Sequence, residues 1–203
     1  MMARLEAWAN GKRQEDESAA AAAATRRAAS FTARKLPLVE RSEPIEVNKF
    51  MGKWYVVAQV PTPLDRGAVN STEEYTWNES KKRIEVSFRM QTSFGAAVRE
   101  IPQRATIVNG QPTTEAPAGI NTRWSLNPSV GGVYLPLGLA YLIVDCAADY
   151  SSTIVGTPSR NLLYVMTRTP SPTEETVSAL LATCERVGYD LSKVERVQHD
   201  VNE

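Results

Sequence analysis

The stretch VNKFMGKWYVVAQVP, residues 47–61, decides how the rest of the chain is interpreted. Gly52 stands two places before Trp54, and an apolar run follows from Val56 to Val60. A run of this length fits one β-strand, and a glycine at its start permits a tight turn into that strand. One interpretation is a strand that begins at Gly52, enters a barrel and carries Trp54 as a plug at its end. The other is that this plug closes a cavity that holds a ligand.

Short apolar segments recur along the rest of the chain. In RIEVSFRM, residues 83–90, every second side chain is apolar, which is typical of a strand with one buried and one solvated face. Further strands are expected within 103–111, within 121–128 where Pro128 stops the strand, within 139–158 as a pair joined near 147–150, and within 160–170. Such spacing, with turn residues between the strands, indicates an antiparallel sandwich or barrel.

One late segment, residues 171–190, has the period of a helix instead. Thr173 can cap its N-terminus, acidic residues follow in the first turn, and Gly188 can end it. The apolar residues at helical spacing form one stripe: Val177, Leu180, Leu181, Cys184 and Val187. We expect this helix to cover the outside of the barrel.

Residues 1–40 differ in composition from the rest and form a low-complexity, Ala- and Arg-rich extension to a folded domain over 41–203. Such a segment cannot bury enough apolar surface to fold alone. Its Ser and Arg content is typical of an organelle transit peptide, although the acids at 15–17 are not, and a flexible tail or docking arm is the alternative. No apolar core of a secretory signal is visible, and the compartment stays open between the cell interior, a plastid and a mitochondrion.

Charge and hydropathy exclude two function classes. The 203 residues include 23 basic and 23 acidic ones, a formal net charge of +0, which argues against a nucleic-acid partner. The longest apolar run, 135–144, is interrupted by Pro136 and Gly138 and is too short for a membrane-spanning helix. The two cysteines, Cys146 and Cys184, either pair or remain buried thiols.

Taken together, these segments resemble the lipocalin family over about residues 47–198. NKFMGKWYVVAQVP is similar to the family's first motif, a Gly-x-Trp-Tyr on the first strand, and PLDRG at 63–67 to an Arg-Gly loop after it. DYSSTIVGTPSRNLLYVMTRTP at 149–170 is similar to the second and third motifs, and residues 174–198 to the closing helix and segment. The likeness is greatest to bacterial outer-membrane lipocalins, apolipoprotein D, and plant temperature-induced and plastid lipocalins.

The resemblance implies an all-β fold: an eight-stranded antiparallel up-and-down barrel with one C-terminal α-helix packed outside. A barrel of this size has an interior that holds side chains or one small ligand. The resemblance also places Arg168 against the indole face of Trp54, so Gly52, Trp54 and Arg168 would form a structural plug at one barrel end.

The implied function is binding or transport of a small hydrophobic ligand, such as a fatty acid, lysophospholipid, sterol or carotenoid-like molecule, without a cofactor. Alternation along the strands predicts the ligand-binding side chains: Val56, Ala58, Val86, Phe88, Met90, Trp124, Leu126, Tyr141 and Ile143. The apolar loop over 131–139 is expected near the barrel mouth, where it either contacts a membrane surface or a protein partner, or folds over the barrel.

Two alternative function classes are weighed against a carrier. An enzyme is not expected, because the single histidine, His199, falls in the C-terminal tail as a solvated residue, and no Cys/His cluster or phosphate loop is present. Asp145, Asp149 and Tyr150 are the remaining acid–base candidates, and a turn Asp usually caps its own backbone. We therefore expect no catalytic residue and no metal site. The other alternative is an accessory subunit of a larger membrane assembly, with the barrel as its scaffold and the extension as a docking arm.

Overall fold

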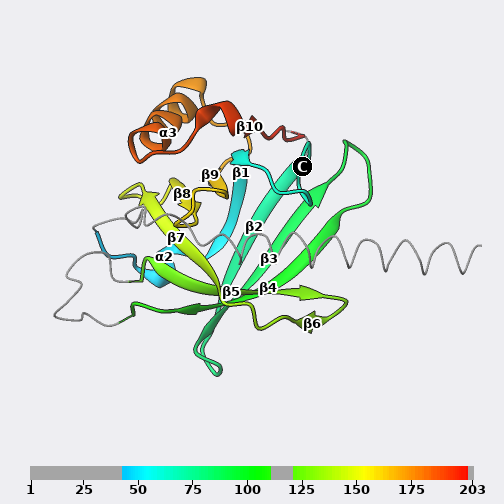
Figure 1. The fold of residues 1–203 in the computed structure, drawn as a ribbon, viewed down its shortest axis with the longest axis vertical. Coiled ribbons are helices and arrows are strands. Elements are labelled where there is room, and N and C mark those ends of the chain that lie inside the picture. Colours follow the sequence, from blue (N-terminus) through cyan, green and yellow to red (C-terminus); the bar gives the residue numbers. More distant parts are fainter. Residues whose placement is uncertain (1–42, 111–120, 201–203) are drawn as a thin grey trace, which may run out of the picture. The chain divides into compact units, whose positions relative to one another are not determined.

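Figure 1 shows the computed structural model of the chain, which describes residues 43–110 and 121–200. Within these ranges eight strands form a closed antiparallel barrel: β1 Gly52–Val60, β2 Val69–Asn78, β3 Arg83–Gln91, β4 Arg99–Ile107, β5 Arg123–Val130, β7 Leu139–Cys146, β8 Ser152–Gly156 and β9 Leu163–Thr167. Each strand pairs with the next, and β9 closes the barrel against β1. The predicted up-and-down barrel is confirmed. The predicted extension over 1–40 lies outside the described residues.

The smaller elements lie at the barrel ends or outside it. They are α2 Val47–Phe50, β6 Val133–Tyr134, α3 Glu174–Arg186, η1 Leu191–Lys193 and β10 Glu195–Arg196. The helical turn α2 precedes β1, and β5 continues past Pro128, which was expected to stop it. Proline is tolerated there because the pairing of β5 with β7 ends at Leu126, so β7 needs no N–H at position 128. Among the described segments, no helix is long and apolar enough to cross a membrane.

One end of the barrel, called the floor, is closed by Trp54 and Arg168. The Trp54 side chain is fully buried, and its indole N–H donates to the Phe50 carbonyl at 2.9 Å. The Arg168 guanidinium carbon lies 3.6 Å from the indole centroid, a cation–π geometry. Gly52, with φ of +96°, provides the tight entry into β1. Since strand direction alternates, the opposite end, called the loop end, carries the loops 61–68, 92–98, 131–138 and 157–162.

Helix α3 packs against the outside of the barrel, as expected. The Thr173 hydroxyl accepts from the Thr176 backbone N–H at 3.2 Å, and Gly188 follows the helix with φ of +91°. The outer apolar cluster joins the helix to β1, β7, β8 and β9: Val57, Ala58, Val60, Leu142, Val144, Ile154, Leu163, Val165, Val177, Leu180, Cys184 and Tyr189. Cys146 belongs instead to the inner cluster, so the two cysteines are buried in different places.

A β-bulge in β1 reverses the facing of part of that strand. Val56 lies opposite Met166, and both belong to the inner cluster. After the register shift, Ala58 lies opposite Val165, and both belong to the outer cluster. The prediction that Ala58 faces the interior is therefore wrong, because an extra residue breaks strict alternation.

The C-terminal segment completes the barrel wall beside the bulge. β1 pairs with β2 only over residues 52–55, and β10 pairs with β1 at Ala58 and Gln59 (Figure 1). On the other side of this segment, the Asn70 N–H donates to the Gln198 carbonyl at 2.9 Å. Residues after α3 thus fill the space between β1 and β2 at the loop end.

We expect Trp54→Ala to lower the free energy of unfolding by about 3–5 kcal/mol, because it removes a fully buried indole and leaves a cavity under Arg168. Urea denaturation followed by circular dichroism measures the change. Trp77→Ala is the matched control, since Trp77 is only partly buried and should cost clearly less. Equal losses in the two variants would contradict the plug role of Trp54.

Candidate functional site

The barrel interior holds the other eight side chains that the sequence predicted to line a ligand site. All of them belong to the inner apolar cluster: Val56, Val86, Phe88, Met90, Trp124, Leu126, Tyr141 and Ile143. They come from four strands, so the fold gathers residues that are up to 87 positions apart between Val56 and Ile143. The interior is therefore mainly apolar along its length.

An aromatic layer fills the interior next to the floor. The Phe50 ring lies 5.1 Å from that of Trp54, 5.3 Å from that of Tyr75 and 5.3 Å from that of Trp124, between centroids. The Trp124 ring stacks on Tyr141 at 5.7 Å. These geometries are favourable aromatic pairs. Trp124 and Tyr141 thus belong to the packed floor half of the interior. Of the other predicted side chains, Phe88, Met90 and Leu126 lie toward the loop ends of their strands, whereas Ile143 lies on the floor side of Tyr141 and Val86 lies opposite Tyr75.

A buried carboxyl group stands directly above this layer. Glu73 on β2 is only 1% exposed, and its Oε2 accepts a hydrogen bond from the Tyr141 hydroxyl at 2.7 Å and another from the Tyr75 hydroxyl. Burial raises the pKa of Glu73 to about 7; the hydrogen bond from Tyr141 opposes this rise and the charge of Asp65 adds to it. Burial and the Glu73 charge raise the pKa of Tyr141 well above its usual value. Glu73 is thus an interior acid held by two tyrosines.

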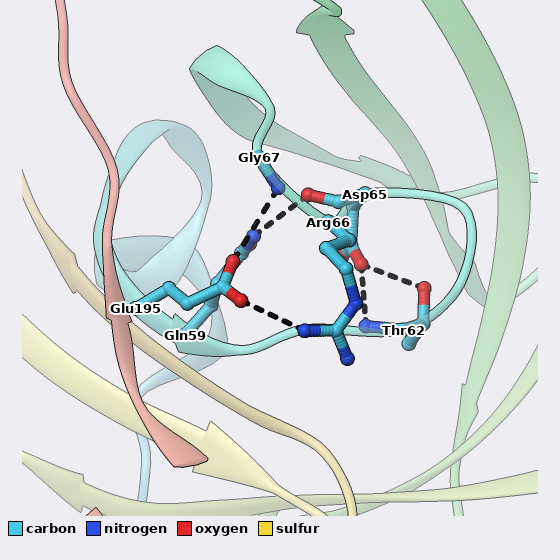
Figure 2. A network of polar contacts seen from close by, with 6 residues as sticks. All are labelled: Gln59, Thr62, Asp65, Arg66, Gly67 and Glu195. Atoms are coloured by element: carbon cyan, nitrogen blue, oxygen red, sulfur yellow. Dashed lines mark hydrogen bonds and ion pairs between the residues drawn. The ribbon is translucent and has the colours of Figure 1, made fainter. Parts of the chain in front are cut away.

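A second buried acid, Asp65, joins the loop after β1 to the interior. Its carboxylate accepts from the Thr62 backbone N–H at 2.5 Å, from the Thr62 hydroxyl at 2.7 Å and from the Tyr164 hydroxyl at 2.7 Å. The Gln59 side-chain amide donates to the Asp65 carbonyl at 2.9 Å (Figure 2). The Tyr164 ring stacks on Phe88 at 5.8 Å, within the inner cluster. Asp65 therefore ties the loop to the inner wall.

The same loop is also tied to the C-terminal segment. Arg66 forms an ion pair with Glu195 on β10 at 2.9 Å, and the Gly67 N–H donates to the other oxygen of that carboxylate at 3.4 Å (Figure 2). The Arg66 side chain is largely exposed and that of Glu195 is partly exposed, so the pair contributes modestly to stability. Asp65 and Arg66, adjacent in the sequence, thus fix the loop from its inner and outer sides.

Two buried polar atoms of the inner wall have no hydrogen-bond partner among the described residues. They are Oε1 of Gln59 and Oγ of Ser71, on side chains that are 1% and 0% exposed. Gln59 lies opposite the inward Tyr164, and Ser71 precedes Glu73 by two positions on β2. Because an unsatisfied buried polar group costs about 1–3 kcal/mol, these atoms are suited to a polar group of a bound molecule.

The acid–base candidates from the sequence lie apart from these acids. Asp149 accepts from the backbone and hydroxyl of Ser151, and these hydrogen bonds lower its pKa, so it caps its own turn as expected. The Tyr150 hydroxyl accepts from the Glu46 N–H at 2.8 Å. In the described part of the chain, no group of His, Cys, Asp and Glu side chains is arranged to hold a metal ion.

His199 does not behave as a solvated tail residue. Its Nε2 lies 2.8 Å from the Val56 carbonyl, its ring meets Tyr55 edge-on at 5.4 Å, and burial lowers its pKa. The expectation was wrong because the C-terminal segment returns to β1. His199 packs on the outer wall against Tyr55.

The sequence interpretation missed Glu73 and Asp65. The signal for Glu73 was present in β2, because Ser71, Glu73 and Tyr75 alternate on one face that a purely apolar criterion assigns to solvent. Asp65 gave no periodic signal, since it lies in a loop, and only the packing of that loop against Tyr164 buries it.

Comparisons with known proteins agree with this geometry. The profile of the lipocalin-like domain matches residues 45–199. Temperature-induced lipocalin-1 of Arabidopsis thaliana is 24% identical over 153 residues, which cover 75% of this chain and 78% of that protein. The outer membrane lipoprotein Blc of Escherichia coli is also 24% identical over 153 residues, with the same coverage. Among solved structures, insecticyanin from the tobacco hornworm Manduca sexta superposes with a TM-score of 0.57 at 16% identity, covering 81% of this chain and 86% of that one, a likeness in fold.

Glu73 should make stability depend on pH. Its pKa is about 7 in the folded chain against 4.5 as the ordinary value, so between these pH values folding takes up a proton. The free energy of unfolding should therefore fall as pH rises from about 4.5 to 7, by on the order of 1–3 kcal/mol from this group.

The variant Glu73→Gln should lose this component, since its side chain cannot ionise. Urea denaturation at pH 5 and pH 8 measures the difference, and Glu74→Gln, on the exposed face of β2, should retain the wild-type dependence. The same pH dependence in all three proteins would contradict the assignment.

Proposed function

Because this chain belongs to the lipocalin family, whose members bind small hydrophobic ligands, we propose that it binds such a ligand inside its barrel and acts as a carrier. Members of the family are typically binding and transport proteins rather than enzymes. The observation that carries the proposal is the apolar inner cluster that extends from the aromatic floor to the loop end. Apolar walls with a few placed polar groups are typical of small-molecule sites.

The ligand site proposed here is the loop-end half of the interior. Next to the floor, the rings of Phe50, Trp124 and Tyr141 pack against one another. These side chains occupy the space that a ligand would need there. The ligand-contacting side chains proposed from the loop-end part of the inner wall are Val56, Phe88, Met90 and Leu126. Val86 lies opposite Tyr75 and Ile143 lies on the floor side of Tyr141, so both belong beside the aromatic layer. A fatty acid, lysophospholipid, sterol or carotenoid-like molecule each has a rigid or extended apolar part that could pack against this apolar wall.

We propose in addition that the loop end contacts a membrane surface. Four exposed apolar side chains lie in or beside its loops: Leu64, Phe94, Val98 and Val133. Arg99 is exposed next to Val98, and a cation beside apolar side chains favours an anionic lipid surface. A hydrophobic ligand could then pass between the bilayer and the barrel without crossing water.

Ligand binding can be tested with Nile red, an uncharged hydrophobic dye. Its fluorescence should rise on binding, and Met90→Trp should weaken the affinity by about fivefold or more, since it fills the inner wall near the loop end. Arg89→Trp, on the outer face of the same strand, should leave the affinity within about twofold. Absence of dye binding, or equal losses in both variants, would count against an interior site.

Membrane contact can be tested by flotation with vesicles of phosphatidylcholine and phosphatidylglycerol. We expect Phe94→Ser to reduce the vesicle-bound fraction by roughly half or more, because it removes apolar area from the proposed contact. Val108→Ser is the control, since Val108 is also exposed but follows β4 at the floor. An equal effect of both changes, or no flotation of the wild type, would reject this proposal.

A further inference from the structure

We propose that the ligand carries a head group that donates hydrogen bonds and is not anionic, an alcohol or an amine rather than a carboxylate, and that this head group lies inside the barrel near Glu73. The inference rests on the proposed carrier function and specifies its ligand class. It excludes fatty acids from the group of ligands that the fold alone would admit. Three features of the barrel support it: the charge of the inner wall, the hydrogen-bonding groups of that wall, and the position of Arg99 at the loop end.

The first feature is charge. Among the described residues, the buried members of the Asp, Glu, Lys, Arg and His class are Asp65 and Glu73, both acids. Neither is paired with a cation: the partners of Asp65 are Thr62 and Tyr164, and those of Glu73 are Tyr75 and Tyr141. Burial, and after it the charge of these carboxyl groups, raises the pKa values of Tyr141 and Tyr164 well above their usual value. A ligand carboxylate would add a third negative group in a medium of low polarity, where like charges repel strongly.

The second feature is the set of polar atoms without partners. The Gln59 amide is oriented by its N–H bond to the Asp65 carbonyl, which leaves Oε1 as a buried acceptor without a donor. The Ser71 hydroxyl, also buried and without a partner, can accept or donate. An acceptor is satisfied by a ligand O–H or N–H and not by a carboxylate. Gln59 lies opposite Tyr164, and Ser71 lies two positions before Glu73 on β2, toward the loop end. A donor on the ligand would therefore supply the hydrogen bonds that these two side chains do not receive from the wall.

The third feature is the position of Arg99. Arg99 lies opposite Met90 in the pairing of β4 with β3, so its register is that of the inner face, but its side chain is exposed at the loop end. It could hold a carboxylate only if the ligand entered tail first and left its head outside. That arrangement would leave Gln59 and Ser71 without partners. A head group inside the barrel thus predicts tighter binding of an alcohol or amine, whereas a head group at the loop end beside Arg99 predicts tighter binding of a carboxylate.

The test compares decanol, decylamine and decanoate, which share one chain and differ in the head group. Each is titrated at pH 8 against the full chain loaded with Nile red, and the concentration that displaces half of the dye is measured. We expect decanol and decylamine to act at a concentration at least about tenfold below that of decanoate, because only they offer a donor without a negative charge. In Glu73→Gln, decanoate should improve by about fivefold or more relative to decanol, and Glu74→Gln should retain the wild-type order.

The outcomes separate this inference from the carrier function. If decanoate displaces the dye as readily as decanol in the wild type, the inference is overturned and the carrier function stands. If Arg99→Gln weakens decanoate alone, the head group lies at the loop end and the inference is again overturned. If neither Nile red nor any of the three compounds binds, the carrier function itself fails and the inference fails with it. The wild-type order does not depend on any variant, so a poorly folding Glu73→Gln would not remove the test.

Discussion

The contact between Arg168 and Trp54 is the constraint on which the rest of the structure depends. One guanidinium covers the indole and donates to the carbonyls of Lys49, Phe50, Met51 and Lys53 at 2.9, 3.2, 3.0 and 2.9 Å. It therefore ties the end of the last barrel strand to the segment that leads into the first. Charge-assisted hydrogen bonds of this kind are the stronger ones in proteins. Once the floor is fixed, strand alternation determines which side chains enter the barrel and how far they lie from its closed end.

The interior combines apolar packing with two buried acids, and within residues 43–110 and 121–200 neither acid is hydrogen-bonded to a cation. Glu73 is stabilised by tyrosine hydroxyls and Asp65 by a loop backbone and Tyr164, so each acid is satisfied by neutral donors. Buried acids of this kind lower stability relative to an apolar wall, and such cost is usually associated with function. In this chain the two acids would give the proposed ligand site a negative charge and hydrogen-bond acceptors, which the fold alone does not specify. The family determines where a ligand would lie, whereas these particular residues determine which head group it would carry.

The sequence predicted the barrel, the helix and the plug because each depends on local patterns: strand alternation, capping residues and a recognisable motif around Trp54. It failed where a tertiary feature overrode the local pattern. The bulge after Val56 turns Ala58 outward. The residue types around this position do not indicate that β1 has an extra residue in its pairing with β9. The burial of Glu73, Asp65 and His199 depends on partners distant in sequence, such as Tyr141, Tyr164 and Val56. Single-sequence periodicity contains no information on such contacts.

The seam between β1 and β2 has a consequence for how the chain folds. The half of β1 beyond Tyr55 receives its second neighbour from β10, and the Gly67–Glu195 contact across this seam joins residues 128 positions apart. Closing so large a loop is entropically slow, and a topology dominated by distant pairings folds over milliseconds to seconds. Until the C-terminal segment arrives, the backbone of β1 presents an open edge to other chains. The step that completes the wall therefore also covers this edge of β1.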